Sequence, residues 1–168
     1  MMEIGDGGLP GIRVWTPRRY HDARGYFFEL MRESTEALLG EGVHFVQDNV
    51  SRSRRGVIRG LHYQDPTPQG KLVCVLEGEV FDVAVDLRPQ SPTYLRWAGE
   101  YLSESNGKQV YIPPGFAHGF AVTSDEALVY YKCTDYYRPD ASRVLRWNDP
   151  GVGVAWPVDD PVLSEGDR

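Results

Sequence analysis

Glycine and proline divide the chain into short stretches, and this spacing is the feature that most limits its fold. The 168 residues include 18 glycines and 12 prolines. The stretches between them are rich in Val, Tyr, Phe and Thr and alternate with period two, as half-buried strands do. They cover residues 44–51, 71–87, 96–104, 108–114, 118–124 and 127–137. Many short strands joined by Gly/Pro turns, with almost no helix, predict an all-β sandwich or barrel.

Local signals add one helix and one turn to this prediction. The stretch "STEALLGEG" predicts a short helix that begins at a Ser34 cap and ends at Gly40 or Gly42. The stretch "LEGEV" around Gly78 predicts a hairpin turn between two strands. The chain has no repeat, low-complexity tract or linker that would divide it. We therefore expect residues 1–168 to form a single domain.

Charge and cysteine content narrow the classes of function. The formal net charge of −6 argues against a general binder of nucleic acid or anionic membranes. No apolar run approaches the roughly 20 residues of a transmembrane helix, so no membrane association is expected. Cys74 and Cys133 lie far apart in apolar surroundings without a CxxC or Cys/His spacing. They are predicted to be buried, reduced thiols, which favours a cytoplasmic protein.

The stretch "GVIRGLHYQ" places His62 inside a predicted strand. Strict alternation would put His62 on one face and Arg59 on the other. A bulge or twist at Gly60 would instead bring both side chains to one cavity, since glycine within a strand often marks such a place. The sequence leaves both arrangements open.

A second histidine, His118, lies in "IPPGFAHGF". Together the two stretches resemble the paired motifs of the cupin superfamily. This resemblance implies a jelly-roll β-barrel or sandwich with one or two short helices. Gln64 stands where the first cupin motif has its second histidine, and Lys71 follows where that motif has a glutamate. Two imidazoles remain where a metal would need three or four ligands, so we expect no metal.

Without a metal, the candidate chemistry is proton transfer. An imidazole has an unperturbed pKa of ~6.5 and is a competent base near neutral pH, especially when a carboxylate orients it. Lys71 is a candidate to meet a developing oxyanion, and Arg59 to bind an anionic group. The tyrosines of "YYKCTDYY" suit a general acid, a ring that stacks on a nucleobase, or plain strand packing.

Seven stretches, some of them quoted above, appear in one order along the chain: "FFELMRE" after "DARG", "FVQDNVSRSRRGVIRGLHYQ", "GKLVCVLEGEVFDVAVDLRPQSPTY", "IPPGFAHGF", "YYKCTDYYRPD", "WNDPGVGVAWP" and "LSEGD". In this order they resemble the dTDP-4-dehydrorhamnose 3,5-epimerase family, from about Gly11 to Asp167. The resemblance implies an isomerase of deoxysugar biosynthesis. It would epimerise C3 and C5 of dTDP-4-keto-6-deoxy-D-glucose through an enolate, without metal or cofactor, to give dTDP-4-keto-L-rhamnose.

The resemblance also implies roles for individual residues. His62 of "RGLH" is the expected base, and Asp167 of "LSEGD" is the carboxylate that orients it. Tyr131 is the expected acid on the opposite face of the sugar, and Lys71 of "GKLV" stabilises the enolate oxygen. Tyr137 is expected to stack on the thymine. The expected substrate-binding set is Arg24, Glu29, Gln47, Asn49, Arg59, His118 and Tyr137. In this family the segment of Arg24 often serves the partner's site, so a homodimer is expected.

Two positions depart from the family pattern. Ser142 stands where a glutamate is common, and Gly166 stands where a lysine is common. Strictness for thymidine is therefore left open. So are three alternatives: a mono-epimerase acting at C3 or C5 alone, a non-catalytic cupin that binds a nucleotide sugar, and a metal-dependent cupin oxygenase or isomerase.

Overall fold

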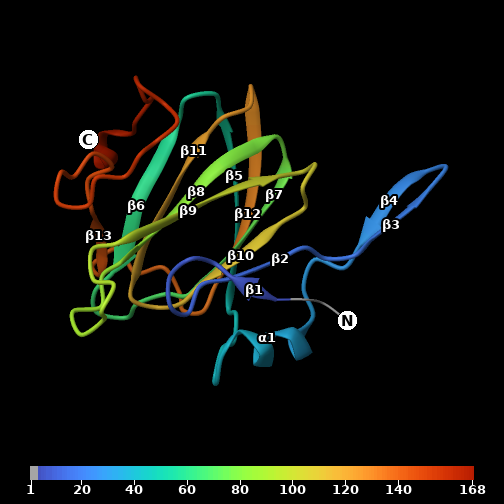
Figure 1. Cartoon of the computed structure of the whole chain (residues 1–168), viewed down its shortest axis with the longest axis horizontal. Helices are drawn as coiled ribbons and strands as arrows, with labels where there is room; N and C mark the ends of the chain where they lie inside the picture. The colour runs from blue at the N-terminus through green and yellow to red at the C-terminus, as the bar shows by residue number, and fades with distance from the viewer. Residues whose placement is uncertain (1–3) are drawn as a thin grey trace.

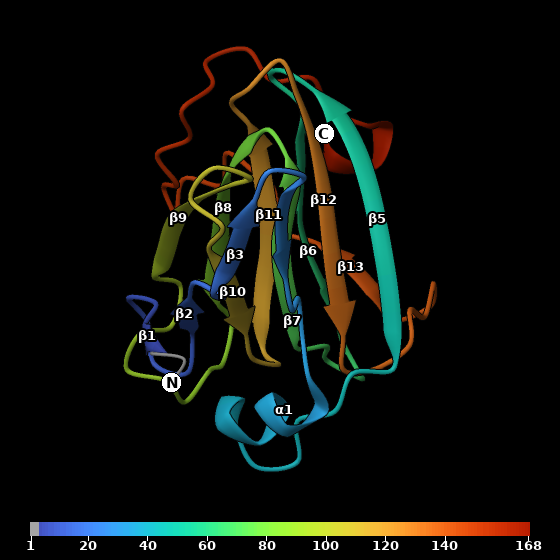
Figure 2. The same cartoon turned by 90° about the vertical axis from the view of Figure 1, so that its right-hand side faces the viewer.

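The computed structural model describes residues 4–168 and is built mainly of antiparallel strands (Figure 1). The larger sheet runs in the order β1 (Gly5–Asp6), β2 (Arg13–Trp15), β10 (Gln109–Ile112), β7 (Lys71–Glu77), β12 (Glu126–Cys133), β5 (Gln47–Arg54). The smaller sheet runs in the order β13 (Ser142–Val144), β6 (Ile58–Gln64), β11 (Phe116–Val122), β8 (Glu79–Asp86), β9 (Trp97–Ser103). The two sheets face each other, which confirms the predicted all-β, cupin-like sandwich (Figure 2).

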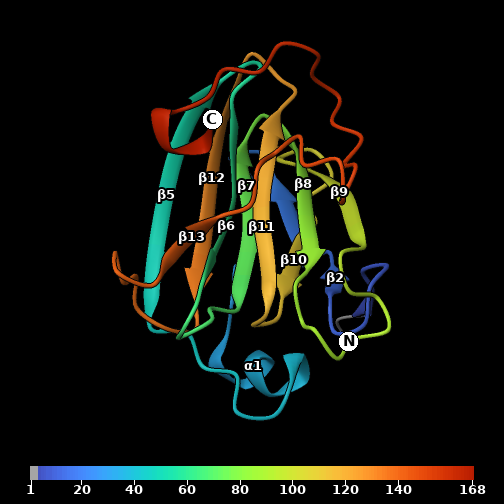
Figure 3. The ribbon, with the colours of Figure 1, turned by 90° about the vertical axis from the view of Figure 1, so that its left-hand side faces the viewer.

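Three smaller elements lie outside these sheets. The strands β3 (Arg19–Asp22) and β4 (Gly25–Phe28) form a hairpin that projects from the sandwich (Figure 1). The helix α1 (Glu33–Leu39) lies at one end of the sandwich, and a 3₁₀ turn, Glu165–Asp167, lies toward the other end (Figure 3). This 3₁₀ turn carries one of the predicted catalytic residues to the cavity described below.

Apolar side chains fill the space between the sheets and also cover the outer faces. The interior cluster includes Val73, Val80, Phe116, Phe120 and Val129. On the outer face of the smaller sheet, Leu61, Val83, Val85 and Ala117 pack beneath Leu145, Val152, Val154 and Trp156. On the larger sheet, Trp15, Leu39, Phe45, Leu72 and Tyr111 form a further cluster. Because both faces are covered, strands such as β11 are buried along their whole length.

The predicted hairpin at Gly78 is wrong. β7 pairs with β10 and β12, whereas β8 pairs with β11 and β9, so the chain crosses from one sheet to the other at this point. Gly78 has a φ of +77°, and a Cβ there would lie 2.0 Å from the carbonyl oxygen of Glu126. The sequence signal for a tight turn was therefore correct, but the turn is a corner between layers.

The predicted helix exists, but its N-cap lies two residues earlier than predicted. α1 begins at Glu33 after an N-cap at Arg32, so Ser34 lies within the helix and does not cap it. Gly40 ends the helix as predicted. Cys74 and Cys133 are buried free thiols, as expected. None of the helices in the described part of the chain is long and apolar enough to cross a membrane.

Candidate active site

Gly60 brings Arg59 and His62 to the same face of β6. The register against β11 shifts here: His118 pairs with His62, but Phe120 pairs with Arg59. Gly60 has a φ of +98°, and a Cβ there would lie 2.6 Å from the carbonyl oxygen of His118. The irregularity breaks strict alternation, and both side chains line one cavity. Of the two arrangements that the sequence left open, the structure adopts the bulged one.

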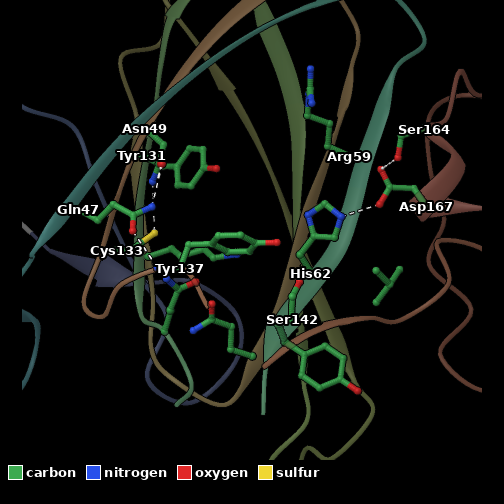
Figure 4. Close-up of a pocket in the computed structure, with 16 residues that line it drawn as sticks. Gln47, Asn49, Arg59, His62, Tyr131, Cys133, Tyr137, Ser142, Ser164 and Asp167 are labelled. Atoms are coloured by element: carbon green, nitrogen blue, oxygen red, sulfur yellow. Dashed lines mark hydrogen bonds and ion pairs between the residues drawn. The ribbon is translucent and has the colours of Figure 1, made fainter. Parts of the chain in front are cut away.

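The cavity has a volume of about 400 Å³ and opens between the two sheets (Figure 4). This size is in the range of small-molecule sites. Its lining is mostly polar: Gln47, Asn49, Arg59, His62, Tyr63, Gln64, Gln69, Lys71, Tyr131, Cys133, Tyr137, Ser142, Val144, Ser164, Gly166 and Asp167. Eight of the eleven residues predicted for the site therefore meet here, although they come from four strands, a loop and the C-terminal 3₁₀ turn.

His62 and Asp167 form a close pair on one wall. His62 Nε2 lies 2.5 Å from Asp167 Oδ1, and Ser164 Oγ donates to Asp167 Oδ2 at 2.8 Å. Burial acts to raise the pKa of the Asp167 carboxyl, but hydrogen bonds from His62 and Ser164 outweigh it and hold the pKa below its usual value. The His62 side chain keeps 44% of its surface exposed, whereas that of Asp167 keeps 6%. A fixed carboxylate thus holds a histidine that is open to the cavity.

Tyr131 projects from the opposite wall (Figure 4). It lies on β12 next to Asn49 of β5, and Cys133, two residues on, lies next to Gln47. Burial raises the pKa of the Tyr131 phenol, so this side chain carries its proton at neutral pH. The cavity therefore has an imidazole on one wall and a protonated phenol on the other.

Lys71 opens β7 and pairs with Cys133 in the sheet register. Its ammonium group is in a buried setting, which lowers the pKa, while the charges of Cys133 and Asp82 act in the opposite direction. Lys71 lines the cavity from β7, which neighbours the strand of Tyr131 in the larger sheet. Its amine is a hydrogen-bond donor to any oxygen placed there.

Three predicted site residues lie elsewhere in this chain. His118 is buried behind the cavity wall, where its Nε2 lies 2.7 Å from Asp82 Oδ2. Arg24 lies on the projecting hairpin and pairs with Asp22. Glu29 follows β4 and pairs with Arg32. The chain alone thus brings together the predicted catalytic set but not the whole binding set.

Some lining residues were not predicted as site residues from the sequence: Tyr63, Gln64, Gln69, Cys133, Val144 and Ser164. For two of them, the position in the sequence could have indicated a place in the site. Cys133 follows Tyr131 by two residues, so both share one face of their strand. Ser164 begins the turn that ends at Asp167. The other lining positions depend on how loops and β13 fold against β6, which has no local signature.

Metal-binding side chains are sparse at this site. Within residues 4–168, no three or more His, Cys, Asp and Glu side chains are grouped so that they could hold a metal ion. His62 and His118 are each paired with one aspartate. A protein site for a transition metal commonly takes three or four such ligands.

The amino-acid sequence matches one family model and several curated relatives. The family model described as dTDP-4-dehydrorhamnose 3,5-epimerase matches residues 6–168. A dTDP-4-dehydrorhamnose 3,5-epimerase of Methanothermobacter thermautotrophicus is 52% identical over 163 residues, which are 95% of this chain and 88% of the relative. One of Neisseria gonorrhoeae is 51% identical over 167 residues, 99% of this chain. The chain spans 51% of the length of that second relative.

A solved structure agrees with the sequence comparison. It is that of a dTDP-6-deoxy-D-glucose-3,5-epimerase from Legionella pneumophila Philadelphia 1 in complex with dTDP-4-keto-L-rhamnose. The TM-score is 0.96 at 48% identity, and the match covers 99% of this chain and 90% of the other. Both the sequence and the fold thus match the same kind of enzyme.

Proposed function

The chain belongs to the dTDP-4-dehydrorhamnose 3,5-epimerase family, and from this premise we propose that it converts dTDP-4-keto-6-deoxy-D-glucose to dTDP-4-keto-L-rhamnose. The reaction inverts C3 and C5 of the sugar by proton transfer, without a metal. One observation carries the proposal: an oriented histidine and a protonated tyrosine face each other across one cavity. Inversion at carbon requires a base on one face and an acid on the other.

His62 is the proposed base. The ketone at C4 acidifies the hydrogens on both neighbouring carbons, so one base serves C3 and C5 in turn. Asp167 accepts a hydrogen bond from the imidazole, fixes its orientation and stabilises the imidazolium that forms. The half-exposed position of His62 supports this role, because the imidazole reaches the cavity while its partner stays buried.

Lys71 and Tyr131 complete the proposed reaction. Removal of the proton places negative charge on the C4 oxygen, and Lys71 is the cation positioned to stabilise this enolate. Tyr131 then returns a proton to the carbon from the opposite face. Its raised pKa supports this role, because a phenol that keeps its proton is able to donate it. Before the second inversion, the His62 imidazolium gives up its proton to solvent and the Tyr131 phenolate takes one from it.

We assign the nucleotide part of the substrate to the part of the cavity that is lined by Arg59, Gln47 and Tyr137. Arg59 donates to Ser53 Oγ at 2.9 Å and has further N–H groups for the diphosphate. Tyr137 is 57% exposed and presents a ring on which thymine can stack. The Gln47 side-chain oxygen accepts a hydrogen bond from the backbone N–H of Tyr137 at 2.8 Å, which holds the backbone of this loop residue against β5.

A homodimer would supply Arg24 and Glu29. The β3–β4 hairpin projects away from its own sandwich (Figure 1). It exposes Tyr20, Tyr26 and Phe27, the last at 70%. Such an apolar surface on a projecting hairpin suits a partner subunit. We therefore assign these two binding residues to the partner's cavity. The buried, reduced cysteines support a cytoplasmic setting for this enzyme.

Proton NMR in D₂O tests the proposal. The chelator-treated protein is incubated with dTDP-4-keto-6-deoxy-D-glucose, and the product configuration and deuterium content are read together. The L-rhamno product labelled at C3 and C5 is expected. Label at one carbon alone would make the protein a mono-epimerase. Absence of label, with dTDP bound, would contradict turnover of this sugar, and activity that needs added metal would contradict the metal-free reaction.

A further inference from the structure

Three glutamine side chains that line the cavity bind the backbone of one loop, residues 135–138. This loop follows β12 and carries Tyr137, so we call it the Tyr137 loop. The glutamines come from β5, from β6 and from the segment between β6 and β7: they are Gln47, Gln64 and Gln69. Each of the four residues in the Tyr137 loop thus has one backbone group bound by a glutamine.

Gln64 makes the most of these contacts. Its Oε1 accepts a hydrogen bond from the backbone N–H of Arg138 at 2.8 Å, and its Nε2 donates to the carbonyl oxygen of Tyr136 at 3.3 Å. The same Nε2 donates to the carbonyl oxygen of Thr67 at 2.9 Å, so Gln64 also joins the Tyr137 loop to the segment before β7. Gln64 is 5% exposed, and backbone groups therefore satisfy its amide in place of water.

The other two glutamines bind the remaining groups. Gln47 Oε1 accepts a hydrogen bond from the backbone N–H of Tyr137 at 2.8 Å (Figure 4). Gln69 Nε2 donates to the carbonyl oxygen of Asp135 at 2.7 Å. Since β5 belongs to the larger sheet and β6 to the smaller one, the Tyr137 loop is held from both sheets.

Burial of its own side chains does not fix the conformation of the Tyr137 loop. Tyr136 and Tyr137 are 59% and 57% exposed, and Arg138 is exposed as well. Segments with few buried apolar contacts open easily, and ordering a free backbone costs conformational entropy. The hydrogen bonds from the glutamines are therefore the interactions that select one conformation of this loop.

We propose that Gln64, assisted by Gln47 and Gln69, is a positioning residue that orders the Tyr137 loop before the substrate binds, so that the ring of Tyr137 is in place for the nucleobase. This inference rests on the proposed function, because it takes Tyr137 as the ring that stacks on thymine. Both polar atoms of the Gln64 amide are used by backbone groups, so Gln64 acts through the loop and not on the sugar. A loop that is already ordered removes the cost of ordering it from the binding step.

Gln64→Met tests the inference, since methionine has a similar length but lacks the amide. If the freed loop occupies the stacking conformation about one tenth of the time, the Kd for dTDP rises about tenfold. We expect that rise by calorimetry and a similar rise in KM, while kcat changes little because the base and the acid are untouched. An unchanged Kd in a folded Gln64→Met protein would overturn the inference.

A double-mutant cycle with Tyr137→Ala separates positioning of the ring from a general loss of structure. If Gln64 acts through the ring, Gln64→Met should weaken dTDP binding much less in the Tyr137→Ala background than in the wild type. Equal losses in the two backgrounds would overturn the inference. An unchanged Kd in Tyr137→Ala alone would remove the stacking ring and the inference with it.

Asn106→Leu is the matched control. Asn106 is also an amide that holds the backbone of a turn, here between β9 and β10, through the backbone groups of Tyr101, Ser103 and Lys108. It does not line the cavity. This variant should lose stability in urea and keep the wild-type Kd for dTDP. An equal loss of affinity in Asn106→Leu and Gln64→Met would overturn the inference.

Hydrogen exchange of the wild type covers the case in which Gln64→Met does not fold. Without ligand, the backbone amides of Tyr137 and Arg138 should exchange slowly, although their side chains are exposed. Exchange as fast as in an open loop would show that the loop is not ordered beforehand and would overturn the inference. Wild-type turnover is measured first: its absence would refute the proposed function itself, whereas fast exchange or an unchanged Kd refutes the role of Gln64 alone.

Discussion

Residues 4–168 hold two histidine–aspartate pairs, and their histidines lie opposite each other on the neighbouring strands β6 and β11. In the first, His62 and Asp167 are 2.5 Å apart; in the second, His118 and Asp82 are 2.7 Å apart. The pairs differ in access. The side chain of His62 is 44% exposed, whereas that of His118 is 7% exposed. Similar hydrogen bonds thus occur in two very different surroundings.

This difference teaches that a hydrogen bond to a carboxylate does not by itself make a catalytic base. A base must touch the hydrogen that it removes, and only the first pair opens to the cavity. Burial keeps His118 neutral, so the second pair is suited to holding a charge in place. We call His62 and Asp167 the outer pair, and His118 and Asp82 the inner pair. We therefore assign proton transfer to the outer pair and positioning to the inner pair.

His62→Asn should have the largest effect. Loss of a general base costs about 10²–10⁴-fold in rate. We expect kcat to fall by that amount while dTDP binding, measured by calorimetry, stays close to wild type. His118→Asn is the comparison variant, and its rate should fall less because it does not touch the reacting carbons. Equal losses in the two variants would remove the distinction between the pairs.

Tyr131→Phe should allow the sugar to exchange hydrogen with solvent but prevent inversion at the carbon. His62 would still remove a proton and return one to the same face, but no acid would remain on the opposite face. We expect deuterium from solvent in the recovered substrate, with product formation reduced by about 10²–10⁴-fold. Proton NMR reads both quantities from one sample. Inversion at an undiminished rate would show that another group is the acid.

Asp167→Asn should weaken catalysis, and it should lower stability at neutral pH, where the wild-type carboxylate is ionised. The pKa of Asp167 is depressed in the folded protein, so its ionised form stabilises the fold above the unfolded value of ~3.9. That stabilisation is lost as the pH falls through the folded pKa. The free energy of unfolding of the variant, measured with urea, should therefore decrease less than that of the wild type as the pH falls below about 4. An unchanged acid limb would show that the carboxylate is not held by its partners.

The double variant Asp82→Leu/His118→Leu should have the smallest effect on stability. Replacing a buried ionic pair by apolar residues is often neutral or stabilising by about 1–4 kcal/mol. We expect a folded protein of near-wild-type stability, by urea unfolding, with strongly reduced kcat. Severe destabilisation would mean that the inner pair is required by the fold.

The sequence predicted the fold better than it predicted the site. The spacing of glycine and proline and the strand patterns between them were sufficient to predict an all-β sandwich or barrel, because turns and strand patterns are local. His62 and Asp167 are 105 residues apart, and no local signal joins them. Their pairing was expected only from family resemblance.

Asp82 shows a second limit of sequence reasoning. The alternation in "EVFDVAVD" is typical of a strand with one polar, solvated face. Here the other face is covered by residues 145–156, so both faces are buried, and Asp82 lies on the interior face between Val80 and Ala84. Period-two patterning does not reveal which face a later segment will cover.

Solvent-deuterium incorporation by His62→Asn, beside the wild type, tests the central claim most directly. Both proteins are incubated with dTDP-4-keto-6-deoxy-D-glucose in D₂O under chelation and followed by proton NMR. If His62 is the base of the outer pair, the wild type will label C3 and C5, and the variant will bind dTDP but label neither carbon. Label at either carbon in the variant, at a rate near that of the wild type, would contradict the account.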